Sequence, residues 1–401
     1  MKEYDVVVIG SGAAGMPAAI SARKNGSSVL VCEKMTKAGK KLLISGGGRC
    51  NLLNETLNET FYNPTGRHLV KSVFERFNRD ALLLFFKEAG LEVSAKEGRI
   101  FPATNQASSV VRVLEVEMNR LGIVVEYGFT VTAIADRGRG FLVSSRDGKQ
   151  VIGKKLVVAG GGKTYPALGS DGSCYPFALQ FGHTLMEPVP SAVPVCAKDP
   201  WCHFQQGQRL QARIRSLIGG TVAGEETGEL LFTQYGLSGT AILDVSEEIS
   251  IAVNREHRKD VAVSVDIVPF MTEEQLETEL RRRLERGVPP SDILAGILPN
   301  RFSNLFETLM QARDTKEMAS RLKNKRFTVT GTRGWNEAEF TAGGIPTNEV
   351  KSETLESRFR SGLHLAGEIL DVQGKRGGYN LAWAWASGLL AGLEAGSASH
   401  P

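Results

Sequence analysis

The chain of 401 residues is 42% hydrophobic and 23% charged and carries a formal net charge of +4, an ordinary composition for a globular protein of two or three domains. The charge excess is too small to indicate a nucleic-acid partner by itself, and no apolar run reaches the ~18 residues of a membrane span. The five cysteines form no C-x-x-C pair and lie in no cluster with metal-ligand spacing, so we expect neither a disulfide framework nor a metal site. The first apolar run begins at Tyr4, which leaves no room for a signal peptide, and we expect a cytoplasmic location.

Residues 4–33 hold the most informative motif. A β-branched run ends at Gly10, the sequence GSGAAG turns into an alanine-rich helical segment, and a second apolar run ends at Glu33. This is the G-x-G-x-x-G dinucleotide fingerprint in its strand–turn–helix–strand setting, followed by an acid about 20 residues on. Gly12 would let backbone N–H groups approach a pyrophosphate at the positive end of the helix, and Gly15 would let the helix pack on the strand. Glu33 can accept hydrogen bonds from both hydroxyls of an adenosine ribose and would repel a 2′-phosphate, so the sequence favours FAD or NAD over NADP.

Further along the chain, hydrophobic periodicity and turn residues predict a series of short elements. After a lysine- and glycine-rich loop, these are helices within 67–90, a hairpin over 91–102, a helix over 107–121, a strand over 123–127, a three-stranded meander over 130–151 and a buried strand over 156–159.

The character of the sequence changes near Pro188-Val189-Pro190. Strand pairs separated by glycine-rich turns follow, at 211–217, 219–223 and 229–233, and residues 272–325 have helical patterning with basic faces. We predict a discontinuous FAD-binding domain, an inserted β-rich substrate domain and a helical subdomain of that insertion. Their boundaries are 1–188 with 334–401, 189–271 with 326–333, and 272–325.

Three later glycine clusters, at 45–51, 160–162 and 367–380, decide between NAD and FAD. An extended FAD needs such returns, because its AMP half occupies the first unit while its ribityl and flavin parts need backbone contacts from distant segments. Glu368 follows a predicted strand and is placed to accept a hydrogen bond from a ribityl hydroxyl. The glycines of 374–380 open the last helix, whose N-terminus would put positive potential near the flavin N1–C2=O locus.

The cluster at 45–51 is too rich in glycine for regular structure. We expect it to wrap a pyrophosphate or ribityl chain, with Lys40, Lys41 or Arg49 neutralising phosphate charge. Asn51 would address the polar edge of the ring. Cys50 has no resolving partner and is either a small packing residue or a reactive thiol near the ring.

Seven segments carry a family pattern: GSGAAG, GKKLLISGGGRCNLLN, FPATNQASSVV, VVAGGGKTYPALGSDGS, GELLFTQYGLSG, EFTAGGIPTNEV and AGEILDVQGKRGGYNLAWAWASG. With them, the chain from residue 4 to about 393 resembles the bacterial BaiN-like FAD-dependent oxidoreductases, which are related to the glutathione-reductase/fumarate-reductase flavoproteins. The resemblance implies an α/β fold: a Rossmann-like FAD domain with an inserted β-rich domain that carries a small helical subdomain. It also implies non-covalent FAD and a small-molecule substrate such as an aminoketone or steroid ketone. His364 stands where the family pattern suggests an aromatic residue, but it lies before the Gly-Glu turn and puts little in doubt.

The resemblance also implies which residues contact FAD. Carried over by position, these include Gly12, Gly15, Glu33, Lys41, the 47–51 loop, Gly161, Glu368 and 378–381. With their neighbours, the candidate cofactor-binding residues are Gly10, Gly12, Ala13, Ala14, Gly15, Glu33, Lys34, Lys40, Lys41, Ser45, Gly46, Gly47, Gly48, Arg49, Cys50, Asn51, Val131, Ala159, Gly160, Gly161, Gly367, Glu368, Gly378, Tyr379, Asn380 and Leu381.

The predicted activity is hydride exchange between flavin N5 and a small ketone, amine or enone. No second G-x-G-x-x-G follows a strand, so NAD(P)H, if it is the donor, would visit transiently. The candidate catalytic residues are Tyr379, Arg376, Asn51 and Cys50. The Tyr379 hydroxyl would donate a proton, or the ring would only pack at the helix entry. Arg376 would hold a substrate carboxylate or a nicotinamide-cofactor phosphate, or would be a solvated loop residue.

Two other readings compete with this one. The first is a flavoprotein that acts on or binds nucleic acid through basic residues of the helical insertion: Arg281, Arg282, Arg283, Arg286, Arg321, Lys323, Lys325 and Arg326. Glutamates interleave with these arginines, so we expect a solvated helix face and no nucleic-acid partner. The second is a non-enzymatic FAD sensor or scaffold. The substrate, the direction of reaction, the electron donor or acceptor and the oligomeric state stay open.

Overall fold

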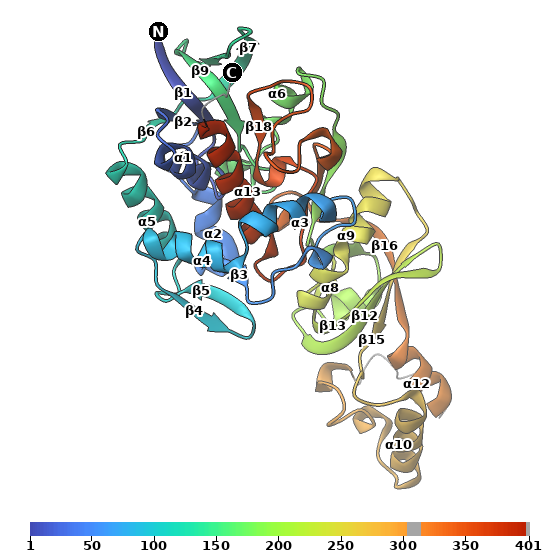
Figure 1. Cartoon of the computed structure of the whole chain (residues 1–401). Coiled ribbons are helices and arrows are strands. Elements are labelled where there is room, and N and C mark those ends of the chain that lie inside the picture. Colours follow the sequence, from blue (N-terminus) through green and yellow to red (C-terminus); the bar gives the residue numbers. More distant parts are fainter. Residues whose placement is uncertain (303–313, 398–401) are drawn as a thin grey trace. The chain divides into compact units, whose positions relative to one another are not determined.

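The computed structural model describes residues 1–302 and 314–397 (Figure 1). The chain divides into two compact units, Met1–Pro188 with Phe340–Pro401 and Val189–Glu339. Each unit has its own core of buried aliphatic and aromatic side chains. No helix among the described residues is long and apolar enough to cross a membrane.

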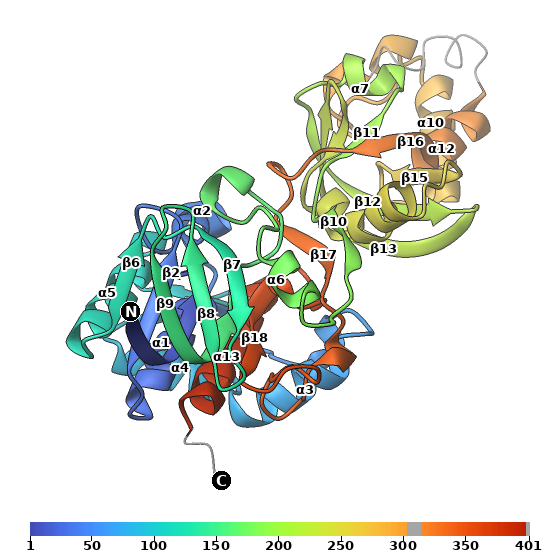
Figure 2. The same ribbon diagram turned by 90° about the horizontal axis from the view of Figure 1, so that it is seen from above.

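A seven-stranded sheet forms the centre of the first unit, and Figure 2 shows its strands side by side. The order is β6 (Val124–Tyr127), β2 (Val29–Glu33), β1 (Lys2–Ile9), β9 (Gln150–Val158), β8 (Phe141–Ser145) and β7 (Val131–Asp136), and β18 (Leu363–Leu365) pairs with β9. Strands β2, β1, β9 and β18 are parallel, and the register sets Ile9 opposite both Cys32 and Val158. The carboxyl ends of these strands therefore meet at one edge of the sheet, where the predicted cofactor motifs begin.

Strand β9 corrects one sequence expectation. The end of the predicted meander and the buried strand at 156–159 are parts of this single strand, Gln150–Val158. Gly153 lies in its middle, and a Cβ there would come within 2.8 Å of a Val7 methyl carbon. This glycine permits close packing inside a strand and does not mark a turn.

Helices and a small sheet cover the seven-stranded sheet. They are α1 (Gly15–Lys24), α2 (Lys40–Gly48), α3 (Arg67–Arg76), α4 (Arg79–Glu88), α5 (Ala107–Arg120), α6 (Tyr175–Leu179) and α13 (Tyr379–Gly396), with β3 (Leu53–Asn54), β4 (Val93–Lys96) and β5 (Arg99–Pro102). The hairpin β4–β5 and the helices of 67–90 lie where the sequence predicted them. Two further strands, β10 (Met186–Ser191) and β17 (Phe340–Gly344), lie next to the unit boundaries along the chain.

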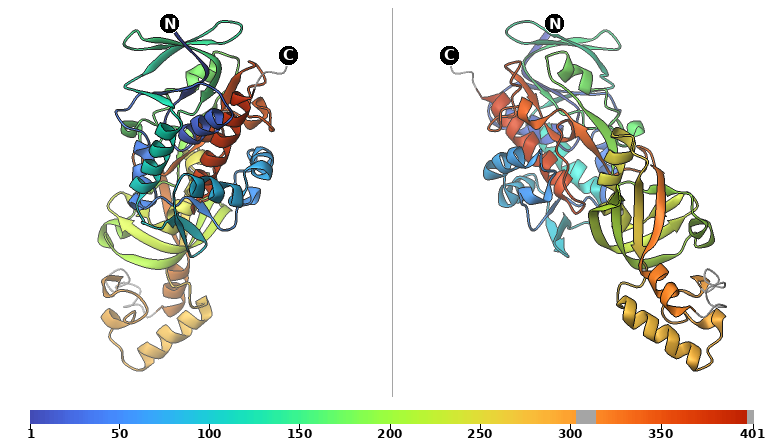
Figure 3. Two further views of the ribbon diagram at one scale, coloured as in Figure 1. Left: turned by 60° about the vertical axis from the view of Figure 1, so that its left-hand side comes forward. Right: turned by 90° about the vertical axis from the view of Figure 1, so that its right-hand side faces the viewer.

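Helix α13 packs closely on α1, and Figure 3 shows the red C-terminal helix beside the dark-blue α1. A Cβ on Gly388 would lie 2.2 Å from the Ala14 carbonyl oxygen, and one on Gly392 would lie 2.1 Å from the Ala18 carbonyl oxygen. Such distances are far inside van der Waals contact, so glycine at these positions lets the two backbones touch.

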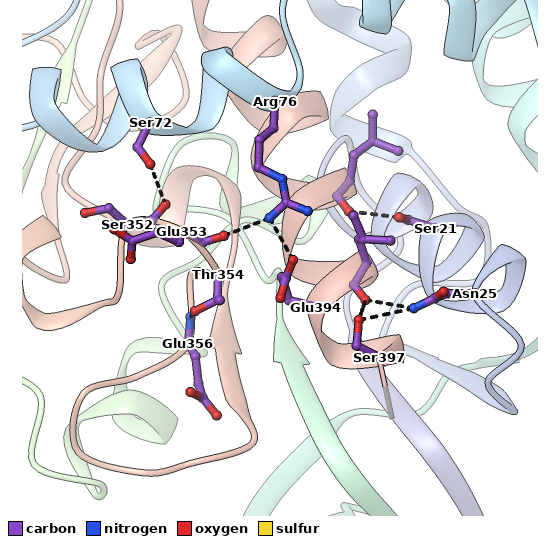
Figure 4. A network of polar contacts seen from close by, with 12 residues as sticks. Ser21, Asn25, Ser72, Arg76, Ser352, Glu353, Thr354, Glu356, Glu394 and Ser397 are labelled. Carbon is purple, nitrogen blue, oxygen red and sulfur yellow. Dashed lines mark hydrogen bonds and ion pairs between the residues drawn. The ribbon is translucent and has the colours of Figure 1, made fainter. Parts of the chain in front are cut away.

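A polar network fastens the C-terminal half of α13 (Figure 4). Ser21 on α1 and Asn25, the residue directly after α1, donate hydrogen bonds to the carbonyls of Leu389 and Leu393, at 2.9 and 3.2 Å. Arg76 on α3 forms an ion pair with Glu394 at 2.7 Å and donates to the Glu353 carbonyl at 3.1 Å. The network joins α1, α3 and the loop before β18 to one helix.

His364 on β18 is buried and lies next to this network. Its Nδ1 is 3.0 Å from the Thr354 carbonyl oxygen, which a neutral imidazole satisfies as a donor. Burial lowers the pKa of His364 to about 4, against smaller opposing effects of the Thr354 hydrogen bond and the carboxylates of Glu356 and Glu394, while the Lys155 ammonium lowers it further. The histidine is therefore neutral in the folded protein near pH 7.

This burial makes stability depend on pH. In the unfolded chain His364 regains a pKa near 6.5, so the unfolded state binds a proton first as the pH falls. The stabilising contribution is complete above about pH 6.5 and is lost as the pH falls toward 4, at a cost of about 2.5 kcal/mol by pH 4.5. His364→Asn keeps an N–H donor for Thr354 and does not titrate, so urea unfolding of this variant should show a shallower fall over that range. Parallel pH profiles for the two proteins would contradict the assignment.

The second unit is built on a closed barrel of six strands. In barrel order these are β11 (Val195–Ala197), β14 (Gly236–Ser238), β13 (Thr221–Thr233), β12 (Arg209–Ile218), β15 (Val261–Asp266) and β16 (Lys325–Thr332). The sequence predicted two strands at 219–223 and 229–233, but in the structure the single strand β13 takes their place. Gly228 inside it lets helix α8 approach, because a Cβ there would lie 2.9 Å from the Thr240 hydroxyl oxygen.

Short helices complete the second unit. They are α7 (Pro200–Phe204), α8 (Thr240–Asp244), α9 (Ser246–Ser250), a π-helical turn over Ile251–Arg255, α10 (Glu273–Glu285), a 3-10 turn over Pro290–Asp292 and α12 (Thr315–Lys323). The helical patterning predicted over 272–325 is thus present in α10 and α12, and 303–313 lies outside the described residues.

Candidate flavin site

The turn between β1 and α1 is shaped by three glycines in different ways. Gly10 has a φ of +96°, and a Cβ on it would lie 2.7 Å from the Ala159 carbonyl oxygen. A Cβ on Gly15 would lie 1.8 Å from the Gly10 carbonyl oxygen, whereas one on Gly12 would meet nothing within 4 Å. Gly10 and Gly15 are therefore needed by the fold itself. Gly12 leaves open space at the N-terminus of α1, where backbone N–H groups can receive a phosphate.

Glu33 is held in place by three donors. The Ser11 backbone N–H and the Ser11 hydroxyl each donate to Oε2 at 2.7 Å, and the Met35 N–H donates to Oε1 at 2.7 Å. The carboxylate thus lies at the carboxyl end of β2 with its orientation fixed by the fingerprint turn. Ser11 was not among the predicted site residues, although it is the x of the first G-x-G.

A second polar cluster lies around Glu368, on the short 3-10 helix Gly367–Ile369 that follows β18. Lys41 of α2 forms an ion pair with Glu368 at 2.7 Å and also donates to the Thr164 hydroxyl. The Thr341 N–H donates to Glu368 Oε1 at 2.8 Å, and the Gly162 N–H lies 3.4 Å from Oε2. Four segments that are distant in the sequence therefore meet at one carboxylate.

The segment 40–51 differs in part from the sequence expectation. Lys40 and Lys41 lie on α2 and not in a loop. The glycine-rich part leaves helical geometry as expected, because Ser45 is extended and Gly46 and Gly47 have left-handed φ values of 56° and 67°. The helix can begin at Lys40 because Gly39, with a φ of 63°, precedes it and turns the chain.

Asn51 and Cys50 follow this segment and differ in what they can do. The Asn51 side-chain oxygen is buried and has no hydrogen-bond partner among the described residues. Cys50 is fully buried, and burial raises the pKa of its thiol to about 12. The thiol is therefore protonated near pH 7, which is the condition of a packing cysteine and not of a reactive thiolate.

The start of α13 is supported from several sides. Gly378 has a φ of 104°, and a Cβ there would lie 2.6 Å from the Leu53 carbonyl carbon. The Asn380 amide bonds back to both the N–H and the carbonyl of Gly374, at 2.8 and 2.7 Å. The N-cap residue of α13, Gly378, supplies no side-chain cap for its first turn. Its N-terminal N–H groups are thus left for another acceptor.

Tyr379 is the first residue of α13. Its ring stacks on Phe61 with centroids 4.6 Å apart, and its carbonyl accepts a hydrogen bond from the Tyr62 hydroxyl at 2.7 Å. Burial raises the pKa of the Tyr379 hydroxyl, so the hydroxyl is a proton donor and not a base near pH 7. Arg376 is half-buried on the loop before it.

The remaining candidates lie at the edges of the site. Lys34 forms an ion pair with Asp171 at 2.7 Å, and Arg49 donates to the Gly46 carbonyl at 3.2 Å. Val131 begins β7, and a Cβ on Gly160 would lie 2.1 Å from the Cys174 sulfur. Thr164 and Thr341 contact Glu368 or Lys41, but neither was among the site residues predicted from the sequence. They lie inside two of the quoted motifs, but no sequence signal tells which way a loop side chain points.

One cluster outside this site resembles a hydrolase triad. His183 lies 2.9 Å from Glu349 and 2.7 Å from the Ser357 hydroxyl oxygen. The Ser357 oxygen also accepts hydrogen bonds from two backbone N–H groups and is only 2% exposed. The cluster therefore fastens a loop and does not present a nucleophile.

The residues at the sheet edge fit FAD. The N-termini of α1 and α13 without a side-chain cap from their N-cap residues, the acid at the end of β2, the Glu368 carboxylate and the unpartnered Asn51 oxygen are polar groups that such a dinucleotide can use. Glu33 would hold the adenosine ribose, the α1 N-terminus the pyrophosphate, and Glu368 the ribityl chain. FAD supplies two-electron hydride chemistry when bound.

A Rossmann-type unit with this set of contacts defines a FAD-binding flavoprotein. The chain belongs to the HI0933-like family, because the model of the HI0933-like protein Rossmann domain matches residues 4–394. It is therefore a FAD-dependent oxidoreductase, and the expected fold class and family resemblance are confirmed.

Full-length relatives and solved structures agree with this assignment. The 3-dehydro-bile acid delta(4,6)-reductase of Clostridium scindens is 35% identical over 97% of this chain and 98% of its own length. The ribosomal RNA dihydrouridine synthase of Escherichia coli is 32% identical over 96% of each chain. The structure of the 3-ketosteroid-delta4-(5alpha)-dehydrogenase of Rhodococcus jostii matches with a TM-score of 0.54 at 17% identity, over 99% of this chain and 97% of that one; it shows the shared fold.

Proposed function

We propose that the protein uses FAD to reduce a carbon–carbon double bond conjugated to a carbonyl group, in a small cyclic enone of the steroid type. The observation that carries the proposal is the 35% identity over 97% of the chain with a delta(4,6)-reductase of 3-dehydro-bile acids. The dihydrouridine synthase supports the same chemistry, because uridine also holds a C=C bond conjugated to a carbonyl. We further propose that the barrel unit, Val189–Glu339, is the substrate domain.

The reaction adds a hydride to the β-carbon and a proton to the α-carbon, and its two electrons would come from NADH or NADPH. This chain must therefore orient the substrate carbonyl and supply a proton. We assign the proton to Tyr379, whose phenol is protonated near pH 7 with its ordinary pKa, and burial raises that pKa further. Asn51, with its unpartnered buried oxygen, would orient a polar edge of the flavin or the substrate. Arg376 is the candidate for a substrate carboxylate or nicotinamide phosphate.

The test is an anaerobic stopped-flow experiment. The purified protein is photoreduced and mixed with a 3-oxo-Δ4 or 3-oxo-Δ4,6 steroid, and reoxidation of the flavin is followed at its visible absorbance maximum while mass spectrometry seeks the product with two added hydrogens. Tyr379→Phe should slow this half-reaction by about 10²-fold if the hydroxyl is the acid. The proposal fails if no conjugated enone reoxidises the flavin faster than buffer does. Parallel mixing of oxidised protein with NADH or NADPH tests the donor.

A second candidate is reduction of uridine in ribosomal RNA, which the 32% identity over 96% of the chain favours. The helical insertion offers little electrostatic support. Arg281 pairs with Glu277 at 2.8 Å, Arg282 and Arg283 both pair with Glu279 at 2.8 Å, and Arg321 pairs with Glu317 at 2.7 Å. Paired arginines leave less positive potential for phosphates. RNA binding with a steep salt dependence and formation of dihydrouridine would favour this candidate over the enone.

We propose a cytoplasmic location, which the five free cysteines support.

A further inference from the structure

Two buried hydroxyl groups lie on the segment that runs from the end of β9 to the first residue of α6, and they have no hydrogen-bond partner among the described residues. They belong to Ser170 and Tyr175, which are 5% and 4% exposed. A buried hydroxyl without a partner costs roughly 1–3 kcal/mol. Two such groups within the segment 160–175 indicate that a polar ligand supplies their missing hydrogen-bond partners.

The side chain of Ser170 lies against Gly161. A Cβ on Gly161 would lie 3.1 Å from the Ser170 hydroxyl oxygen and 4.0 Å from Glu368 Oε2. The backbone at Gly161 has a φ of +75°, so a side chain is excluded there by conformation as well as by space. The Ser170 hydroxyl and the Glu368 carboxylate thus both lie beside Gly161 without bonding to each other.

Tyr175 is the first residue of α6. Its ring lies over Gly172, whose Cβ would be 3.3 Å from two ring carbons, and the Gly172 N–H in turn donates to the Gly162 carbonyl at 3.0 Å. Burial and the nearby carboxylates of Glu368 and Asp371 raise the pKa of the Tyr175 hydroxyl. The phenol is therefore a donor near pH 7, close to two carboxylates that it does not bond.

The charges and hydrogen-bonding groups of Ser170, Tyr175 and Glu368 indicate which kind of ligand fits beside them. A phosphate would meet the negative charge of Glu368, whereas a polyhydroxyl chain can donate to the carboxylate and accept from both hydroxyls. We infer that the Ser170 and Tyr175 hydroxyls donate hydrogen bonds to the ribityl chain of the bound FAD, so that the segment from Gly160 to Tyr175 grips the cofactor. This rests on the flavoprotein assignment and not on the proposed enone substrate.

The test uses the holoprotein and its Tyr175→Phe and Ser170→Ala variants. FAD affinity is measured from the fluorescence of flavin released on dilution, and stability from thermal unfolding with and without excess free FAD. We expect each variant to release FAD with a dissociation constant about 10-fold higher, as for one lost hydrogen bond. After the bound FAD has been removed, Tyr175→Phe should be as stable as the parent or more so, because it removes a hydroxyl that is unsatisfied in the FAD-free protein.

Ser27→Ala is the matched control. Ser27 lies beyond the C-terminal end of α1. It is also buried, but its hydroxyl has a partner, because it donates to the Gly396 carbonyl at 3.1 Å. This variant should lose stability and keep its FAD affinity. The inference is overturned if Tyr175→Phe and Ser170→Ala behave like this control, since the two hydroxyls would then hold a structural water. It is equally overturned if neither affinity nor stability changes in Ser170→Ala, the variant with the smaller change in volume. None of these outcomes depends on the substrate.

Discussion

Gly15→Ala is expected to lower the free energy of unfolding by about 3 kcal/mol or more, whereas Gly12→Ala should leave it unchanged within about 0.5 kcal/mol. The added methyl of Gly15→Ala would lie 1.8 Å from the Gly10 carbonyl oxygen, and a backbone atom between a strand and a helix cannot move away cheaply. At Gly12 the same methyl meets nothing within 4 Å. The two substitutions add the same atom three residues apart, so each is the control for the other.

For FAD affinity, Gly12→Ala is the substitution with the direct effect. Because backbone N–H groups beside the open space at Gly12 would receive the pyrophosphate, Gly12→Ala should weaken FAD binding by about 10-fold or more while the protein stays folded. Urea unfolding gives the first quantity and flavin released on dilution the second. A folded Gly12→Ala protein with parental FAD affinity would show that the phosphate does not lie at this turn.

Glu33→Arg should weaken FAD binding by about 1–3 kcal/mol, or roughly 5- to 150-fold. The carboxylate accepts from the Ser11 N–H, the Ser11 hydroxyl and the Met35 N–H, all at 2.7 Å, and would accept from the ribose hydroxyls as well. An arginine supplies no acceptor and faces those donors with a charge in a site that is 8% exposed. The free energy of unfolding should fall too, because buried donors lose their partner.

Glu33→Gln is the control for this variant. It keeps one acceptor oxygen at nearly the same place, so its loss of affinity should be clearly smaller than that of the arginine. Equal losses would mean that charge, and not hydrogen bonding, is what the ribose end of the site requires. Parental affinity in Glu33→Arg would remove Glu33 from the cofactor site.

Local patterns determined much of this protein from sequence. The apolar runs, the GSGAAG turn and Glu33 predicted β1, α1 and β2, because strand, turn and helix signals depend on residues within a few positions of each other. The quoted motifs identified the flavoprotein family and its fold class. The site residues themselves, among them Gly12, Glu33, Lys41, Gly161 and Glu368, stay predictions.

The structure alone decided which distant groups meet and how deeply each is buried. The ion pair of Lys41 with Glu368 joins residues 327 positions apart, and no local pattern selects one partner among many. Glycine was ambiguous for the same reason: glycine-rich segments served to predict turns, but Gly153 and Gly228 allow close packing inside strands, since a missing side chain serves either purpose. Burial also separated Cys50, with a thiol pKa of about 12, from a reactive cysteine, because desolvation is set by everything packed around the group and not by its neighbours in the chain.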